Sequence, residues 1–529
     1  MELRKALSVL SKSSPYAVTT AEGLNDPEVK KIKEYLFIET DIEMAFSSKL
    51  QSLKKDQIIF LCGSSGDGKS EIMTKYQLTH KGAIDFHLDA THSFEPHKTA
   101  IDTLNDVFTV HRDSDKPLAI GINIGMLANF EREGDVAHEQ VKNSIRDYLE
   151  NKNDNALHTF LSFESFPKFK ILDGEVDSSF FKSLLNKVVK DDIRNPFCDL
   201  FNACISSNKD SKLVVNFRLL RNKLIQKVIV ELLFDARIRK DQFITTRMLL
   251  DFIFCILTGP KYLFDNLFDG GDNEILAVLA NFDPSLIRNK KLDLFILHRT
   301  LEFEDQAYEM FTREVESTYG VLPEQPPQST IRLFYLLKYT SLDWNYHQDF
   351  KQSFNEDSQK RYKFVWEKHK KYSGTSEEKK ALRKFYDDVI YSAINKHANR
   401  NAPYLSKDEF YISSHGGCDL ASEMELSVDY KSVEKDQAED LAAFNVYLEV
   451  NEQRLPPIPV GVNLLNLMMG IVSGYRPNKH DKNSIVLLDE LVTKIADMAS
   501  LSDVLYLHAN GKRIKLKANS DNEIRVSGV

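Results

Sequence analysis

A glycine-rich octapeptide carries the clearest chemical signal in the sequence. Residues 63–70 read Gly-Ser-Ser-Gly-Asp-Gly-Lys-Ser, which matches the pattern G-x-x-x-x-G-K-[ST] at every fixed position. Glycines let such a loop curl so that its N–H groups point inward at phosphate oxygens. The lysine reaches the β and γ phosphates, and the last hydroxyl coordinates Mg²⁺. The segment therefore predicts a site for a nucleoside triphosphate, taken here to be ATP, together with Mg²⁺.

Nine consecutive residues make up the predicted nucleotide-binding set. Within it, Lys69 is expected to act on the phosphates during catalysis and Ser70 to be a metal ligand. The carboxylate of Asp67 gains nothing from phosphate, so it is expected to point to solvent or to a Lys or Arg. The full set is Gly63, Ser64, Ser65, Gly66, Asp67, Gly68, Lys69, Ser70 and Glu71.

Polar side chains follow two apolar runs downstream of the loop. Asp89 ends one of them, and Asn123 ends the run at residues 117–123. Ligands of open α/β sheets bind at the carboxyl ends of the strands, so both side chains are expected near the loop. Asp89 is the candidate to hold Mg²⁺ or its waters, unless it caps a helix or turn. Asn123 is the candidate to orient the attacking water, unless it is a turn residue.

Arg247 stands near the start of an apolar helix pattern, in the segment Thr-Thr-Arg-Met-Leu-Leu-Asp-Phe at residues 245–252. From a lid or from a neighbouring subunit it could reach a γ-phosphate, where an arginine stabilises the charge that develops during transfer. Pairing with an acid of its own helix is the alternative. A role in trans requires a homo-oligomer, which the sequence leaves open.

A basic segment lies far from the loop. Residues 360–384 contain ten Lys or Arg against three Glu, a net +7, in a chain whose total is −9. Interleaved aromatic residues would suit contact with DNA or with a DNA-bound partner. A solvated helix pair with an aromatic core stripe is the alternative, and the favoured one. The candidate contacts are Lys360, Arg361, Lys363, Lys368, Lys370 and Lys371.

Short apolar runs and helical patterns must position the loop and the residues near it. Strands are expected over 57–62, 83–89 and 117–123, with helices over 70–80 and 97–110. This alternation predicts a parallel sheet with helices on both faces. The run 166–172 is a candidate further strand of the same sheet.

The rest of the chain reads mainly as helix and ends in a small mixed module. Residues 485–496 resemble an ATPase acid pair at Asp489-Glu490, but their spacing favours an amphipathic helix. Alternating residues over 444–450 predict a strand, and Asn-Gly at 510–511 predicts a hairpin. The expected architecture is an α/β P-loop NTPase domain with a parallel sheet over 1–260, with a lid reaching about 320, a mainly helical region over 261–404, and a C-terminal α+β module over 405–529.

Composition narrows the function classes. The chain lacks an apolar run of the roughly 20 residues that span a bilayer, so no membrane association is expected. Five scattered cysteines without a CxxC pair favour reduced thiols in a cytoplasm over zinc or disulfides. A net charge of −9 argues against a generally basic surface. A D-x-n-E-x-K signature does not stand out, so nuclease activity of its own is not expected.

Three segments in this order resemble the DptF (DndF) family, the ATPase-like subunit of bacterial DNA phosphorothioation-dependent restriction. They are FLCGSSGDGKSE at 60–71, FHLDATHSF at 86–94 and AIGINIGMLANF at 119–130. The length and the ending, NSIVLLDELVTKIA at 483–496 before a terminal hairpin, are also similar to that family. The absence of an Asp-Glu pair after the third strand departs from the commonest ATPases and leaves the hydrolytic acid open.

The resemblance implies a role in defence against foreign DNA. Members act with DptG-like and DptH-like partner subunits, on DNA that lacks the host's sulfur-substituted backbone, and are expected to supply nucleotide-driven switching or motor action. Two functions therefore stand side by side. The chain is expected to be an ATP-hydrolysing subunit of such a complex, or a nucleotide-binding switch and assembly scaffold with little hydrolysis of its own.

Overall fold

The chain divides into two compact units in a computed structural model. The first comprises Met1–Lys170, Val176–Ala236 and Gln242–Asn355, and the second Ile171–Glu175, Arg237–Asp241 and Glu356–Val529. The structure describes residues 2–14, 27–90, 97–150, 152, 157–240, 243–354, 357–406, 408–436, 441–478, 481–509, 511–518 and 524–528.

These limits differ from the boundaries expected at residues 260 and 404. Buried polar contacts cross the first: the backbone N–H of Leu263 donates to Asn216 Oδ1 at 2.7 Å. Others cross the second, where the amide of Asn399 donates to the carbonyl of Glu409 at 2.8 Å. Each expected boundary therefore falls inside a packed unit.

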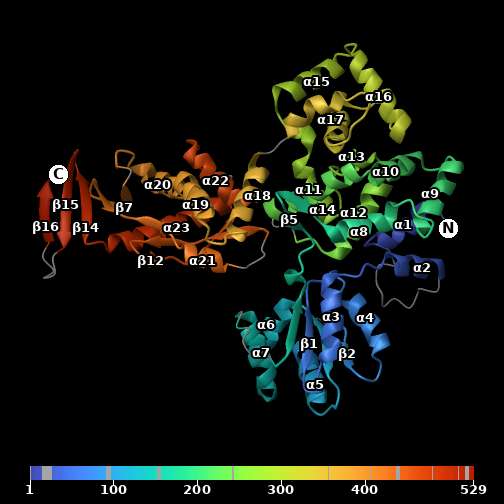
Figure 1. Ribbon diagram of the computed structural model, residues 1–529, viewed down its shortest axis with the longest axis horizontal. Coiled ribbons are helices and arrows are strands. Elements are labelled where there is room, and N and C mark those ends of the chain that lie inside the picture. Colours follow the sequence, from blue (N-terminus) through green and yellow to red (C-terminus); the bar gives the residue numbers. More distant parts are fainter. Residues whose placement is uncertain are drawn as a thin grey trace. The chain divides into compact units, whose positions relative to one another are not determined.

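A four-stranded parallel sheet forms the amino-terminal part of the first unit (Figure 1). Its strand order is β2-β3-β1-β4. The strands are β1 (Ile58–Cys62), β2 (Asp85–His87), β3 (Leu118–Ile122) and β4 (Thr159–Ser162). Every residue of β1 and β3 is buried, which accounts for their unbroken apolar sequences. The three strands expected around the loop are confirmed.

The further strand expected at 166–172 is wrong for this sheet. The fourth position is taken by β4, which pairs along β1. Part of the expected run instead forms β5 (Lys170–Leu172), which pairs with β6 (Glu175–Asp177) in a separate hairpin. Asp173 and Gly174 have φ angles of 51° and 77°, so the chain reverses there and cannot run on as a central strand.

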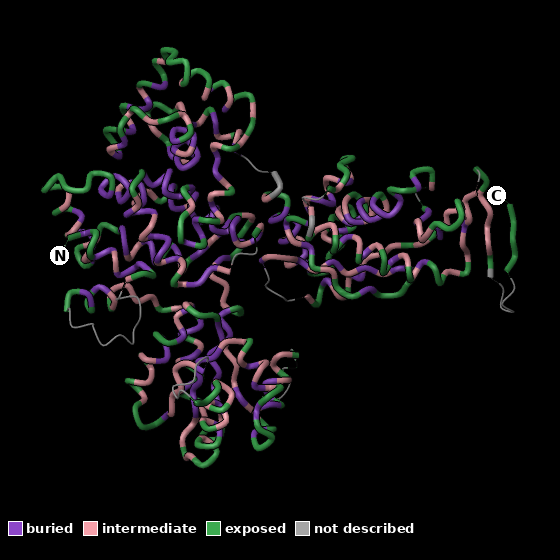
Figure 2. Tube along the Cα trace, turned by 180° about the vertical axis from the view of Figure 1, so that it is seen from behind, coloured by how far each residue is buried: buried purple, intermediate pink, exposed green. Residues whose placement is uncertain are grey.

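Helices cover both faces of this sheet (Figure 1). One face carries α3 (Asp41–Ser52) and α4 (Lys69–Thr79), and the other carries α5 (Ala100–Arg112), α6 (Ile124–Glu133) and α7 (Glu139–Leu149). Alternate residues of β1 serve the two cores: Phe60 packs with Phe108 and Phe130, and Leu61 packs with Met73. Figure 2 shows buried residues gathered along these strands. The predicted three-layer arrangement is confirmed.

The rest of the first unit is helical, as expected. Thr245 begins α12 as an N-cap, its hydroxyl accepting from the backbone N–H of Met248. The helices are α1 (Leu3–Leu7), α2 (Pro27–Leu36), α8 (Ser179–Val189), α9 (Pro196–Ser206), α10 (Ser211–Arg221), α11 (Lys223–Arg239, whose end belongs to the second unit), α12 (Thr246–Thr258), α13 (Leu263–Asn266), α14 (Glu274–Leu279), α15 (Lys290–Thr300), α16 (Gln306–Tyr319) and α17 (Pro327–Leu336).

The second unit combines helices with antiparallel sheets. Its helices are α18 (Asp357–Lys370), α19 (Ser376–Phe385), α20 (Ser392–Ala398), α21 (Tyr430–Lys435), α22 (Val462–Val472) and α23 (Lys482–Ser500). Its strands are β7 (Glu409–His415), β8 (Cys418–Glu423), β9 (Leu426–Val428), β10 (Ala443–Val446), β11 (Leu448–Val450), β12 (Gln453–Arg454), β13 (Ile458–Gly461), β14 (Val504–Ala509), β15 (Lys512–Ala518) and β16 (Ile524–Gly528). The largest sheet has the order β16-β15-β14-β8-β7.

Two expectations about this unit are confirmed. The antiparallel pair of β14 and β15 is the predicted hairpin, with Gly511 at a φ of 73°; Asn510 lies outside the described residues. Asp489 sits within helix α23 and not at a strand end. Its carboxylate lies 2.8 Å from His397 Nε2 and 3.2 Å from the guanidinium of Arg400. Asp489 therefore belongs to an ion-pair cluster of the second unit.

A buried histidine makes the first unit sensitive to acid. The backbone N–H of Ile58 donates to His158 Nδ1 at 3.1 Å, and burial lowers the pKa of His158 from 6.5 to about 4. The folded state therefore binds fewer protons than the unfolded state between these values. The histidine contributes its full stability above pH 6.5 and loses roughly 3 kcal/mol as the pH falls to 4. We expect His158→Asn, which keeps an acceptor, to flatten the pH dependence of urea unfolding followed by circular dichroism.

His298→Asn, at an exposed position, is the matched control and should leave that dependence unchanged. An unaltered pH profile in His158→Asn would contradict the assignment.

Across the described residues, no helix combines the length and the apolar character needed to cross a bilayer.

Candidate functional site

The predicted loop connects the carboxyl end of β1 to the first turn of α4. Gly66 and Gly68 have φ angles of 86° and 105°, a region that L side chains rarely adopt. A Cβ on Gly63 would stand 2.7 Å from Phe163 Cδ2, so this position needs glycine for space. Ser70 and Glu71 lie in the first turn of α4 and are exposed. The loop therefore ends on a helix N-terminus, which favours an anion.

Lys69 turns back onto its own loop. Its ammonium donates to the carbonyl of Gly63 at 2.7 Å and to that of Ser64 at 2.8 Å. Burial lowers the pKa of Lys69, while the negative charges of Asp67 and Asp89 act in the opposite direction. The cation is thus held at the loop, among groups that a bound phosphate would replace.

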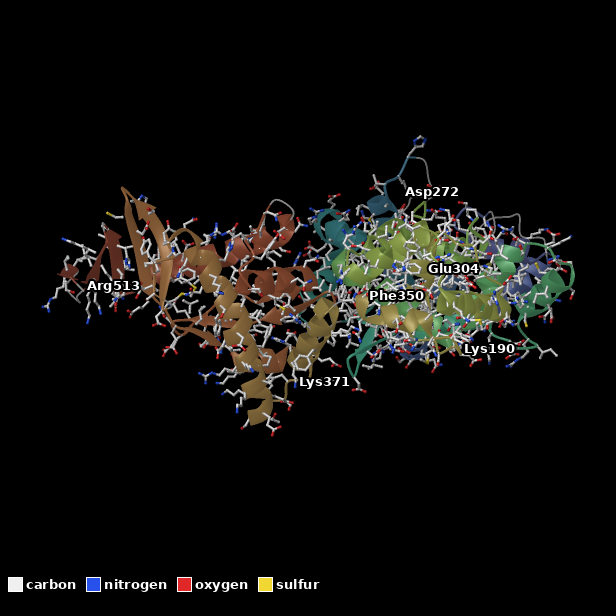
Figure 3. All side chains as sticks on the ribbon, turned by 90° about the horizontal axis from the view of Figure 1, so that it is seen from above. Lys190, Asp272, Glu304, Phe350, Lys371 and Arg513 are labelled. Carbon is white, nitrogen blue, oxygen red and sulfur yellow. The ribbon has the colours of Figure 1, made fainter. Side chains whose placement is uncertain are left out.

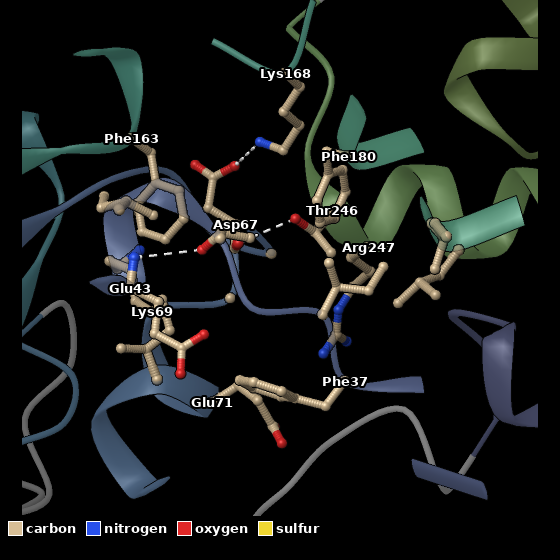
Figure 4. A pocket seen from close by; sticks show the side chains of 18 of the residues that line it. Phe37, Glu43, Asp67, Lys69, Glu71, Phe163, Lys168, Phe180, Thr246 and Arg247 are labelled. Atoms are coloured by element: carbon tan, nitrogen blue, oxygen red, sulfur yellow. Dashed lines mark hydrogen bonds and ion pairs between the residues drawn. The ribbon is translucent and has the colours of Figure 1, made fainter. Parts of the chain in front are cut away.

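Asp67 anchors the loop internally. Its side chain is fully buried, accepts from the backbone N–H of Ser64 at 2.8 Å, and pairs with Lys168 at 2.9 Å (Figure 4). Of the two directions expected for this carboxylate, the one toward a lysine is confirmed and the one toward solvent is wrong. Ser64 and Lys168 stabilise the buried charge, since an unpaired carboxylate in this position would be costly.

The start of α12 braces the loop from outside the sheet. The backbone N–H of Arg247 donates to the carbonyl of Gly66 at 3.0 Å. The hydroxyl of Thr246 donates to the carbonyl of Asp67 at 3.1 Å (Figure 4). A Cβ on Gly66 would stand 3.0 Å from Arg247 Cβ. Two successive loop carbonyls are therefore held by one helix terminus.

The side chain of Arg247 is exposed and lines the same cavity as the loop. Figure 4 shows it on the side of the loop where Phe37 and Glu71 lie. Its charge also reaches Lys33, whose pKa is lowered chiefly by burial and further by Arg247. Arg247 therefore lies beside the loop of its own chain.

Asp89 and Asn123 both line the cavity, at the carboxyl edge of the sheet. Because β3 lies between β1 and β2, Asn123 follows the strand beside the loop, and Asp89 follows the next one. The N–H of Ala90 donates to the carbonyl of Gly121 at 2.9 Å, which ties the Asp89 segment to β3. Asn123 also caps α6, its Oδ1 accepting from the N–H of Met126 at 2.7 Å. The sheet thus brings both predicted residues to the loop.

These residues surround a cavity of about 840 Å³. Its lining includes residues 65–72 of the loop and α4, together with Asp89 and Lys168. Apolar side chains also contribute, among them Leu36, Phe37, Ile38, Phe180, Leu184 and Leu250. A cavity of this size, lined by both polar and apolar groups, is large enough for a nucleotide.

In the structure, much of the basic segment at 360–384 is buried or ion-paired, which its composition did not indicate. Tyr362, Trp366 and Tyr372 are buried, which leaves Phe364 as its exposed aromatic residue. Lys370 pairs with Asp436 at 3.5 Å. Lys371 (Figure 3) pairs with Glu367 at 3.3 Å and with Asp173 at 3.5 Å. Lys363 is buried, and Lys368 lies over the Phe364 ring. The remaining candidates, Lys360 and Arg361, are exposed. The alternative of a helix pair with an aromatic core fits this arrangement.

Sequence reasoning missed Lys168, Thr246 and Phe37. Lys168 and Thr246 lie 101 and 179 residues from the Asp67 that they contact, and neither belongs to a recognisable motif. Phe37 precedes β1 by about twenty positions in a stretch without a clear period. The weak signal available was the buried-looking Asp67 itself, because a carboxylate inside a phosphate loop needs a cation.

Gly66→Ala tests the close packing of α12 on the loop. We expect it to weaken ATP binding by at least about tenfold, because the φ of 86° costs roughly 1–2 kcal/mol and the new Cβ lies 3.0 Å from Arg247 Cβ. Gly82→Ala is the matched control, since Gly82 has a φ of 89° and no neighbour within 4 Å. Isothermal titration of both variants measures the difference. Equal affinities would show that the helix terminus does not shape the loop.

No group of three or more His, Cys, Asp or Glu side chains suited to hold a metal ion occurs among the described residues. Comparison with models of protein families, with curated proteins and with solved structures gives no match for this chain.

Proposed function

We propose that the chain binds Mg²⁺–ATP at residues 63–70 and hydrolyses it. The observation that carries this is the position of Lys69, whose ammonium rests on the carbonyls of Gly63 and Ser64 at the wall of a cavity of about 840 Å³. A lysine in that place exchanges two carbonyl partners for phosphate oxygens with little movement. The glycine conformations and the N-terminus of α4 supply N–H donors for the same oxygens.

The chain's own residues divide the work. Lys69 would bind the β and γ phosphates. The Ser70 hydroxyl and the Asp89 carboxylate, which follows β2, are the groups that would hold the metal. Asn123 Oδ1 is committed to α6, so its amide nitrogen is the group left to orient a water or a phosphate oxygen. Arg247 stabilises charge on the terminal phosphate. Magnesium bound with ATP would neutralise phosphate charge.

The resemblance to the DptF (DndF) family supports a role for this activity in DNA restriction. On that basis we propose an ATPase subunit of a phosphorothioation-dependent DNA restriction complex, working in the cytoplasm with DptG-like and DptH-like subunits on DNA. The packed, ion-paired helices of 360–384 weaken the case that this segment supplies the DNA contact.

A second function, a nucleotide-dependent switch with little hydrolysis, is favoured by one observation. The carbonyls of Gly66 and Asp67 are bonded to Arg247 and Thr246 at the start of α12. Any change of loop shape on nucleotide binding would therefore move a helix of the helical part directly. This coupling between the loop and α12 is what a nucleotide-dependent switch requires, and it does not require hydrolysis.

ATP affinity and phosphate release by the purified chain, alone and with DNA, separate the two functions. A hydrolysing subunit binds Mg²⁺–ATP and releases phosphate over many turnovers. A switch binds with comparable affinity and releases less than one phosphate per chain, yet changes its protease sensitivity near α12. Failure to bind ATP at all would overturn both.

A further inference from the structure

The carboxyl-terminal sheet has two unlike faces at its β16 edge. Residues opposed in an antiparallel pair point to the same side, so Arg513, Lys515 and Lys517 of β15 share one face with Arg525 of β16. The other face carries Ile514, Leu516, Ile524 and Val526, together with Lys512. Figure 3 shows Arg513 on these strands, and Figure 2 shows β16 exposed along its length.

Only part of the positive charge on the first face is neutralised. Arg513 donates to Glu409 at 2.8 Å, lies 3.3 Å from Glu423, and stacks over the Tyr506 ring at 4.0 Å. Lys515, Lys517 and Arg525 form no ion pair with another described residue, and we call these three the cationic strip. Two acidic residues between β15 and β16, Asp521 and Glu523, lie outside the described residues.

The arrangement of the cationic strip costs stability. Lys517 and Arg525 are directly opposed across β15 and β16, and like charges in that position destabilise a sheet. Lys515 stands two residues from Lys517 on the same face, about 7 Å away along the strand. Lys517 and Arg525 are exposed, and Lys515 is half-buried, with its ammonium 5.6 Å from the centre of the Tyr506 ring. The repulsion among these cations is unfavourable to the fold, whereas a polyanion laid across them relieves it.

The same face lacks the anchors that a protein partner uses. Tyr506 is buried at 3% exposure beneath Arg513, and His508 is bonded to Glu409 at 3.1 Å. On the described parts of β14, β15 and β16, this face therefore offers charge without an exposed aromatic ring. Protein interfaces centre on buried apolar and aromatic anchors, while interfaces with nucleic acid are more polar and strongly positive.

We propose that the cationic strip binds the phosphate backbone of a nucleic acid, without reading its bases. Duplex DNA carries a negative charge about every 1.7 Å along its axis, so cations about 7 Å apart each find a phosphate. The contact is electrostatic and falls steeply with salt. It shows no base preference, because the described parts of β14, β15 and β16 present no exposed aromatic ring on this face. It does not depend on the nucleotide site, so it stands or falls separately from the proposed ATPase.

The test measures binding of a fluorescein-labelled mixed-sequence DNA duplex to the full chain by fluorescence anisotropy, over about 50–200 mM salt. The triple variant Lys515→Gln, Lys517→Gln, Arg525→Gln should bind at least about tenfold more weakly at low salt. Its log–log salt slope should fall by about 2–3 units, the contribution of three phosphate contacts. ATP affinity should stay at the wild-type value.

Lys512→Gln is the matched control, because Lys512 belongs to the same strand and to the opposite face. It should leave DNA binding unchanged. Thermal unfolding of the triple variant separates binding from a structural role. If the three cations stabilise the fold, the unfolding midpoint falls. If they repel one another, as Lys517 and Arg525 do, the midpoint stays the same or rises.

Three outcomes would overturn the proposal. They are wild-type DNA affinity in the triple variant, an equal loss in Lys512→Gln, and displacement of DNA by poly-glutamate at equal charge concentration, which would assign the strip to an acidic protein.

Discussion

Lys69→Met is expected to lower ATP turnover by at least about a hundredfold and to remove most ATP binding, while the chain stays folded. The methionine keeps the length of the side chain but cannot offset phosphate charge. Loss of one well-placed donor to a developing charge typically costs 10²–10³ in rate. The carbonyls of Gly63 and Ser64 also lose their donor, at about 1 kcal/mol each in the free protein.

Isothermal titration and phosphate release measure the two effects of Lys69→Met, and circular dichroism confirms the fold. Lys81→Met is the matched control, because Lys81 is exposed and lies beyond the end of α4. Wild-type turnover in Lys69→Met would show that the loop takes no part in catalysis.

Asp89→Asn is expected to reduce turnover by about a hundredfold and ATP affinity by only a few-fold. Asparagine preserves the size of the side chain and an oxygen acceptor. It lacks the charge needed to hold the metal's waters, which matters most when charge develops on the transferring phosphoryl group. Turnover should therefore fall much more than ATP affinity, whereas Lys69→Met should lower both.

Asp85→Asn is the control for Asp89→Asn, since Asp85 begins the same strand at its other end, beside Ser114 and Lys116. It should leave both constants close to wild type. Equal losses of turnover and affinity in Asp89→Asn, or none, would place the metal-holding acid elsewhere.

The local pattern of apolar residues was sufficient to predict the strands and the helix on either side of the loop. The unbroken apolar runs at 57–62 and 117–123 fill the centre of a sheet covered on both faces, so burial left little choice of residue. The spacing of 485–496 likewise favoured a helix over an acid-bearing strand, and α23 spans it.

Local pattern failed where residues far apart in the chain decide the outcome. The fourth strand of the first sheet is β4, whose Thr159–Ser162 sequence is too short and mixed to signal burial. The run 166–172 had the better pattern but ends at the turn of Asp173. The ion pairs of 360–384 could not be predicted for the same reason, since partners such as Asp436 are distant in sequence. The cationic strip escaped notice because strand register, which composition does not reveal, gathers its members.

The bracing of the loop by α12 has a consequence for biosynthesis. Thr246 and the loop residue it holds are separated by 179 positions. A ribosome that adds about 5–20 residues per second needs roughly ten to forty seconds to cover that interval. Throughout it the emerging chain displays β1 and the glycine-rich segment without the helix that fixes their geometry. Nascent chains stalled before residue 245 should therefore fail to retain ATP, because the helix that holds the loop carbonyls has not yet been made.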